Sequence, residues 1–295
     1  MATHRRETVE QPEPPATTPR PGSGRRPWWV AVAVMLLAAA MLALWAGTQA
    51  HGQGWWPATG LPPGQHATVA PAALNSLTGN PWAPREGDGT ATFDSRRDGF
   101  AATADQEQAE DAPKPRYRTV DGVEVAEFSL PGGGKRAEIV PDTPSDRDGE
   151  ERWVRYRTQL RDMPVDTESW QLILQWHHNG NSGSPPIALE VGRGELRLAN
   201  EGAHQQSLGP IGSNDVVDVV LHVRFSQDPA EGLVEVWRDG RPVLAGYHPP
   251  GGTLLDSSNY LKFGLYRDPD ITQPTSMTVT DLVIGDTPAA VGATP

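Results

Sequence analysis

The chain has 295 residues, a formal net charge of −12 and no cysteine. This length accommodates one large domain or two small ones. The absence of cysteine excludes a disulfide framework and a thiolate zinc site. No basic patch dominates the acidic sequence, so we expect no nucleic-acid partner.

The first predicted element is an apolar segment over residues 27–47, which contains no charged side chain. It is long enough to cross a bilayer as a helix, which takes about 20 residues. Trp28 and Trp45 lie near its two ends, as in an interfacial aromatic belt, and Arg25 and Arg26 directly precede it. Because positive charge is retained on the cytoplasmic side, the segment predicts a signal anchor.

This anchor predicts a single-pass membrane protein with its C-terminal domain extracellular. Residues 1–26 would form a basic cytoplasmic tail. The alternative is a cleaved signal peptide, with the small residues at 48–50 as the cleavage site. The apolar segment exceeds the usual length of a signal-peptide core, which favours the anchor. Both alternatives place the following domain outside the cell.

Residues 48–90 are rich in Pro, Gly and Ala and show no apolar period, which indicates a flexible linker. Short apolar and polar alternations follow over residues 91–287, punctuated by Gly, Pro and Asp. Such a pattern is typical of an all-β sandwich or barrel. We expect the last residues, 288–295, to form a disordered tail.

Side chains alternate along a strand, so each run can be sorted into two faces. In 135–140, Ala137 and Ile139 oppose Arg136 and Glu138. The other runs give apolar faces made of Val154, Tyr156 and Leu160, of Leu172, Leu174 and Trp176, and of Leu261, Phe263 and Leu265. The side chains opposite these faces are polar except for Ile173, and they are Arg155, Arg157, Gln159, Gln171, Gln175, His177, Tyr260, Lys262 and Tyr266.

Four of these segments resemble one known family. Gln175-Trp176-His177 is similar to the Gln-Trp-His strand of heparin lyase I, and 260–267 resembles its Lys-x-x-x-Tyr strand. The sequence Lys135-Arg136-Ala137-Glu138-Ile139 is similar to the Arg-x-Glu strand of that family. Residues 234–243 resemble a hairpin that glucuronan lyases also share, with Asp239-Gly240 as its two-residue turn. The four segments occur in the family order.

The resemblance implies a β-jelly roll of two antiparallel sheets, with an anionic polysaccharide lying across the concave sheet. It implies that His177 is the catalytic base and that Tyr266 is the acid, or both base and acid for the other uronate epimer. Lys262 and Arg136 match groups that bind the substrate carboxylate. Gln175 lies on the same predicted face and is suited to hydrogen-bond that carboxylate.

Two further arginines join the predicted substrate-binding set. Arg155 has a suitable side chain on a polar strand face, and Arg267 directly follows Tyr266. The predicted reaction is β-elimination in a 4-linked uronic-acid polymer. Cations and donors around the carboxylate would stabilise the enolate-like transition state, and a base and an acid would move the protons.

One alternative function stays open, a jelly-roll module that binds a polysaccharide without cutting it. We expect a monomer and no obligatory cofactor. Calcium is possible at Asp146, Asp148 and Glu150, although their spacing misses any standard calcium loop.

Overall fold

The computed structural model describes residues 90–108, 113–180 and 183–293. All of them belong to one compact unit. The predicted cytoplasmic tail, the membrane anchor at 27–47 and almost the whole linker lie outside the described residues. Within the described part of the chain, no helix has both the length and the apolar character needed to cross a bilayer.

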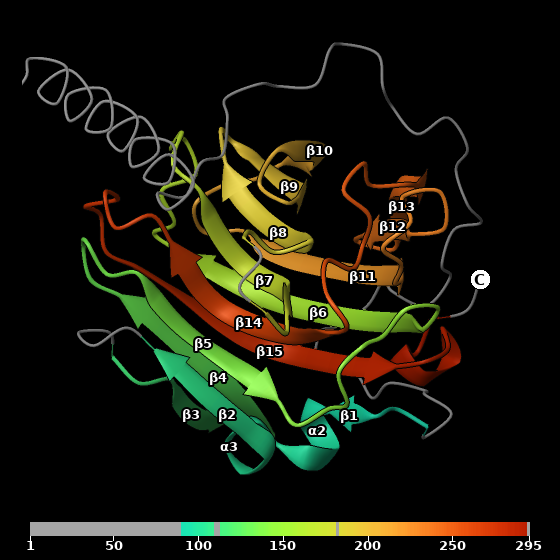
Figure 1. Ribbon diagram of the computed structural model, residues 1–295. Helices are drawn as coiled ribbons and strands as arrows, with labels where there is room; N and C mark the ends of the chain where they lie inside the picture. Colours follow the sequence, from blue (N-terminus) through green and yellow to red (C-terminus); the bar gives the residue numbers. More distant parts are fainter. Residues whose placement is uncertain (1–89, 109–112, 181–182, 294–295) are drawn as a thin grey trace, which may run out of the picture. The chain divides into compact units, whose positions relative to one another are not determined.

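The described residues form two antiparallel β-sheets, seen as two curved layers in Figure 1. The first, which we call the back sheet, has the order β13-β12-β11-β6-β15-β4-β3, with β1 paired to β15. Its strands are β1 (Phe93–Asp94), β3 (Arg116–Val120), β4 (Val123–Leu130), β6 (Glu151–Arg161), β11 (Val216–Arg224), β12 (Leu233–Arg238), β13 (Arg241–Tyr247) and β15 (Thr275–Gly285).

The second sheet, which we call the site sheet, has the order β10-β9-β8-β7-β14-β5-β2. Its strands are β2 (Ala104–Gln108), β5 (Arg136–Pro141), β7 (Gln171–His178), β8 (Ile187–Gly192), β9 (Glu195–Asn200), β10 (His204–Pro210) and β14 (Asn259–Arg267). The helices are short: α2 (Ser95–Asp98), α3 (Phe100–Thr103) and a 3-10 helix (Ala289–Val291). Two facing antiparallel sheets fit the predicted jelly-roll sandwich.

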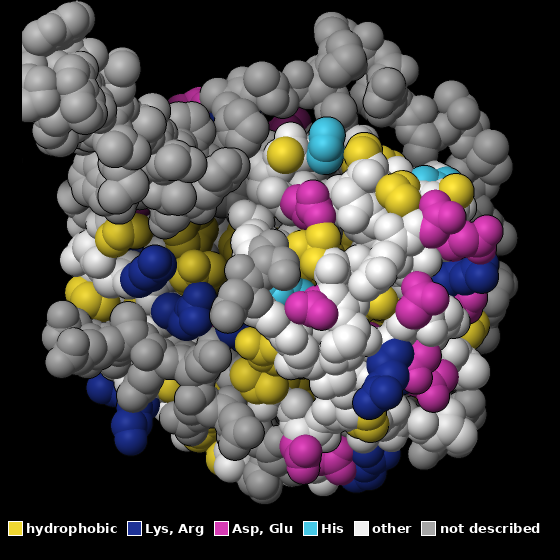
Figure 2. Space-filling view, in the orientation of Figure 1, with side chains coloured by type: hydrophobic (Ala, Val, Ile, Leu, Met, Phe, Trp, Pro, Cys, Tyr) yellow, Lys and Arg dark blue, Asp and Glu magenta, His cyan; other side chains and the backbone are white. Residues whose placement is uncertain are grey.

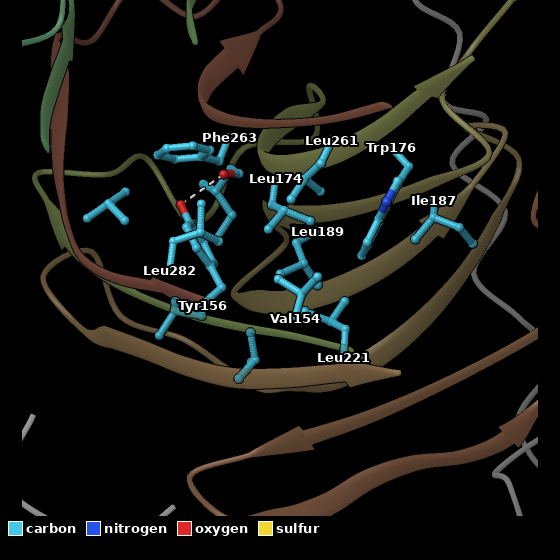
Figure 3. Close-up of a cluster of buried hydrophobic side chains, with 14 of the residues drawn as sticks. Val154, Tyr156, Leu174, Trp176, Ile187, Leu189, Leu221, Leu261, Phe263 and Leu282 are labelled. Carbon is cyan, nitrogen blue, oxygen red and sulfur yellow. Dashed lines mark hydrogen bonds between the residues drawn. The ribbon is translucent and has the colours of Figure 1, made fainter. Parts of the chain in front are cut away.

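The hydrophobic core lies between the two sheets and draws side chains from both. Tyr156 of β6 and Phe263 of β14 meet with their ring centres 6.3 Å apart. The Tyr156 hydroxyl donates to the carbonyl of Ile173 at 2.9 Å, the bond drawn in Figure 3. This bond satisfies the one polar atom that Tyr156 brings into the core. Each fully buried aliphatic or aromatic side chain here contributes about 1.5–3 kcal/mol.

Tight two-residue turns set the register of three hairpins. Asp239 and Gly240 both have positive φ, at 52° and 74°, as the predicted turn requires. Two more such turns occur, at Asp121-Gly122 and at Arg193-Gly194. Positive φ at both central residues matches the right-handed twist of the flanking strands, which is why Gly occupies the second position each time.

The predicted disordered tail is wrong for most of its length. Residues 288–293 are part of the fold: Pro288 precedes the 3-10 helix, and Val291 and Ala293 are fully buried. Both pack against Trp153 and Trp237 on the outer face of the back sheet. The sequence signal was misleading because this short Ala- and Gly-rich segment has no period, yet it covers two tryptophans.

Candidate active site

Three neighbouring strands of the site sheet, β5, β14 and β7, turn a polar face away from the core. On β14 the core side holds Leu261, Phe263 and Leu265, as the alternation predicts. Lys262 and Tyr266 therefore point outward. On β5, Ala137 and Ile139 are in the core while Arg136 and Glu138 point outward, which confirms that assignment too.

A β-bulge in β7 changes the predicted faces of that strand. The pairing with β8 shifts between Leu172 and Leu174, and both Ile173 and Leu174 enter the core. Leu172 lies instead on the outer face, packed with Trp170. The prediction that placed Leu172 in the core and Ile173 opposite it is thus wrong. Beyond the bulge, Gln175 takes the outward position that the sequence predicted.

Gly264 allows β14 to bend where Tyr266 is placed. Its φ of 135° is a backbone conformation that residues with a Cβ rarely adopt. A Cβ at this position would lie 2.3 Å from the carbonyl oxygen of Ala137. The pairing with β7 shifts in the same place, between Phe263 and Tyr266. Tyr266 is thereby paired with Arg136 on one flank and Leu172 on the other.

The Tyr266 ring is held by a side chain of β5 and by a side chain directly before β7. The guanidinium carbon of Arg136 lies 4.0 Å from the ring centre, a cation–π contact. From the β7 side, the ring of Trp170 lies 4.6 Å away at 65°, an edge-on contact. Tyr266 is half-buried, so this pair of contacts orients the ring while leaving it accessible.

Glu138 is buried beneath the site and holds two of the predicted substrate-binding side chains. Its carboxylate accepts from Nε2 of Gln175 at 2.5 Å and pairs with Nε of Arg136 at 3.1 Å. A carboxylate only accepts hydrogen bonds, so the Gln175 amide turns its nitrogen toward Glu138. An amide nitrogen has two hydrogens, and this bond uses one of them. The family resemblance marked Glu138 without giving it this role.

His177 lies half-buried on the outer face, outside the inter-sheet core. Its Nδ1 lies 2.8 Å from the carbonyl of His178, so Nδ1 carries the hydrogen and Nε2 carries the lone pair. Burial lowers the pKa of His177 below its ordinary value, and the nearby charge of Lys262 acts in the same direction. The neutral imidazole, which is the form that accepts a proton, is thereby favoured.

Lys262 lies opposite Gln175 in the pairing of β14 with β7. The side chain is almost fully buried, and its Nζ lies 5.1 Å from the ring centre of Tyr260. The Tyr260 ring in turn lies 5.6 Å from that of His177. Arg136, Gln175, His177, Lys262 and Tyr266 therefore share one face on three adjacent strands.

Two arginines of the predicted set lie elsewhere. Arg155 is on β6 of the back sheet, where its Nε pairs with Asp281 at 3.4 Å. Arg267 is fully buried on the side opposite Tyr266, and its Nη2 donates to the carbonyl of Pro131 at 2.7 Å. Neither side chain reaches the polar face of the site sheet, so the structure does not bring these two predicted substrate-binding residues together with the other five.

Each of the three acidic residues considered for calcium has partners within the protein. Asp146 pairs with Arg152 at 2.6 Å and accepts from the indole nitrogen of Trp176 at 2.9 Å. Glu150 accepts from the backbone N–H of Arg147 in its own turn and also pairs with Arg152 at 3.9 Å, while Asp148 accepts from the backbone N–H of Gln227. Among the residues that the structure describes, no group of three or more His, Cys, Asp or Glu side chains is arranged to hold a metal ion.

The sequence analysis missed a second polar cluster on the same face, over β8, β9 and β10. Glu190 pairs with Arg197 at 2.8 Å, and Gln205 bonds to both side chains. Burial raises the pKa of the Glu190 carboxyl to about 7, against the opposing attraction of Arg197. The alternation in 187–199 could have revealed this cluster, since Glu190 and Arg197 fall on the polar side of their strands.

The sequence profile of the polysaccharide lyase family matches residues 73–283, well over half of the chain. The chain belongs to the polysaccharide lyase family. It is therefore a lyase, and the polar face of the site sheet is the candidate active site of a polysaccharide lyase. No curated protein sequence matches this lyase.

Several solved structures are similar in fold to this polysaccharide lyase. An endo-β-1,4-glucuronan lyase from the fungus Trichoderma reesei is 17% identical over 70% of this chain and 98% of its own, with a TM-score of 0.46. An alginate lyase of family PL7 from Zobellia galactanivorans is 15% identical over 61% of this chain and 82% of its own, with a TM-score of 0.43.

Proposed function

We propose that this lyase cleaves a 4-linked uronic-acid polymer by β-elimination. The observation that carries the proposal is the gathering of five side chains on one face of the site sheet. They are a histidine whose pKa is lowered by burial (His177), a tyrosine (Tyr266), and three groups of a kind that binds carboxylates (Arg136, Lys262 and Gln175). The resemblance of four segments to heparin lyase I and glucuronan lyases supports the same substrate class.

The proposed reaction begins with proton removal from the carbon next to the uronate carboxylate. Arg136, Lys262 and Gln175 would bind that carboxylate and stabilise the negative charge that develops on it, usually the largest catalytic contribution. The C5–H bond breaks, its electrons form the C4=C5 double bond, and the bond from C4 to the glycosidic oxygen breaks. The departing oxygen takes a proton, and the product ends in an unsaturated uronate.

His177 and Tyr266 divide the two proton transfers in this proposal. Nε2 of His177 carries the lone pair needed to accept the C5 proton, because Nδ1 is bonded to the His178 carbonyl. The Tyr266 hydroxyl would protonate the departing oxygen, or perform both transfers on the other C5 epimer. Lys262 and Tyr266 lie four residues apart on β14, roughly 13 Å in an extended strand. Lys262 therefore suits carboxylate binding better than proton exchange with Tyr266.

A panel of polyuronates tests the substrate class. We expect the domain, produced without residues 1–47, to convert at least one of polyglucuronate, polymannuronate and polyguluronate to a product that absorbs in the ultraviolet, as the new double bond requires. A neutral 4-linked glucan, which lacks the carboxylate, is the control and should give no product. Binding to a polyuronate without any product would favour the alternative of a carbohydrate-binding module. Cleavage of the neutral glucan would contradict the mechanism.

We also propose that the lyase is a monomer tethered to the outside of the membrane through residues 27–47. The support is the uncharged, Trp-flanked segment preceded by Arg25 and Arg26. Protease added to intact cells should remove the domain and leave a cytoplasmic marker protein untouched. Mature protein in the medium with its N-terminus near His51 would show that the segment is a cleaved signal peptide.

A further inference from the structure

We propose that Trp170 is a positioning residue for the reaction, because it fixes the direction of the Tyr266 hydroxyl. The inference rests on the proposed function, in which that hydroxyl moves a proton. Trp170 does not belong to any segment that resembles the family, and it precedes the first residue of β7.

Trp170 is anchored at the site by backbone and side chain together. Its carbonyl accepts from the backbone N–H of Asp268 at 3.0 Å, which ties it to the chain just beyond the end of β14. Its indole packs with Leu172, Ala188 and Ala199 in a small apolar cluster that Tyr266 borders. Only 6% of Trp170 is exposed, so the ring has little freedom to move.

The β7 bulge is what brings this cluster to the outer face. In an unbroken strand that keeps Leu174 in the core, Leu172 and Trp170 would also face the core. The extra residue at the bulge reverses the alternation of side chains between the two faces of the strand. Trp170 and Leu172 therefore lie on the same side as Tyr266. The bulge therefore places an indole beside the catalytic phenol.

Arg136 and Trp170 approach Tyr266 from opposite flanks of β14, because β5 and β7 are its two neighbours in the sheet. Arg136 covers a face of the phenol ring, and Trp170 contacts it at 65°. A phenol oxygen lies on the axis of its ring, so rotation about the first side-chain bond moves the hydroxyl through several ångströms. If Arg136 on one flank were the only contact, the Tyr266 ring could turn toward β7. The indole of Trp170 blocks that movement.

Trp170 can be replaced without disturbing the inter-sheet core. Its cluster lies on the outer face of the site sheet and is separate from the main core. A matched control exists on the other sheet: Trp237 of β12 is 3% exposed and also belongs to a small outer cluster. Replacing either tryptophan removes a similar buried area, but only Trp170 touches Tyr266.

The experiment is a double-mutant cycle measured on the polyuronate that the lyase cleaves. We expect Trp170→Leu to lower kcat by about tenfold to a hundredfold with KM changed by less than about threefold, because misplacement of a catalytic group acts on the reacting step. In a Tyr266→Phe background the same change should cost less than about twofold, because the hydroxyl it positions is already gone. Trp170→Phe, which keeps an aromatic edge, should restore much of kcat, and Trp237→Leu should leave it unchanged.

Equal losses of kcat in the two Tyr266 backgrounds would overturn the proposal, as would full kcat in Trp170→Leu. Crystal structures of the wild type and Trp170→Leu give a measurement that does not depend on activity. We expect Tyr266 to leave its wild-type orientation in the variant, and an unmoved Tyr266 ring would overturn the positioning role. If the wild type cleaves no polyuronate, the proposed function fails, and the crystal structures alone decide whether Trp170 orients Tyr266.

Discussion

Replacing Tyr266 by Phe should lower kcat by at least about a hundredfold, the usual contribution of a positioned acid or base. The change removes one oxygen atom and keeps the ring. The contacts of that ring with Arg136 and Trp170 should therefore persist, and the strand should keep its pairing. KM should change little, because the lost interaction forms mainly in the transition state. Steady-state kinetics on the cleaved polyuronate provide the measurement.

The matched control for this variant is Tyr247→Phe. Tyr247 lies on β13 at the edge of the back sheet and is partly buried, as Tyr266 is. It should retain wild-type kcat, and the thermal unfolding temperatures of both variants should stay close to that of the wild type. Near-normal turnover by Tyr266→Phe would remove Tyr266 from the mechanism and leave both proton transfers to other groups.

The sequence predicted the faces of β5 and β14 correctly because the alternation of faces continues through both strands, even where the pairing of β14 with β7 shifts near Gly264. Ala137 and Ile139 are buried between the sheets, and so are the apolar residues of β14, while Arg136 and Lys262 point away. The family resemblance added what periodicity alone cannot supply, namely that β5, β7 and β14 lie together. The structure agrees, with β14 between the other two strands.

The corrections come from information that alternation does not contain. A polar strand face does not reveal which sheet its strand joins. The alternation therefore could not show that Arg155 lies on the back sheet. Leu172 was assigned to the wrong face because a bulge reverses the phase within β7. Arg267 follows Tyr266 directly and so points to the other side, where carbonyl groups of the segment before β5 hold it.

The supporting residues of the site depend on contacts distant in sequence. Glu138 meets Gln175 across 37 positions, and Trp170 meets Tyr266 across more than twice that separation in the chain. Spacing in the sequence does not mark Glu138 or Trp170 as a supporting residue, because only the pairing of β5, β14 and β7 brings each of them to its partner. The local residue pattern determines which way a side chain points, and the order of the strands in the sheet determines which other side chains it contacts.

The acid limb of the pH profile should report His177. Burial lowers the pKa of His177 in the folded protein, and Lys262 adds to the effect. In the proposed mechanism the neutral imidazole accepts the proton, so kcat/KM should fall as the pH drops through this lowered pKa. We therefore expect the acid limb to lie below the usual histidine value of about 6.5. The Lys262→Met variant removes a nearby positive charge and should move the limb toward higher pH.

His177→Gln should lower kcat/KM by about a hundredfold to ten-thousandfold and remove the acid limb from the residual activity. Gln keeps a polar side chain of similar size but does not titrate in this range. The matched control is His222→Gln on β11 of the back sheet, where His222 stacks on Trp153 and bonds to Glu235. That variant should keep the wild-type kcat/KM and the wild-type acid limb, since the imidazole that it removes lies in the other sheet. An acid limb that persists at the same pH in His177→Gln would mean that another group accepts the proton.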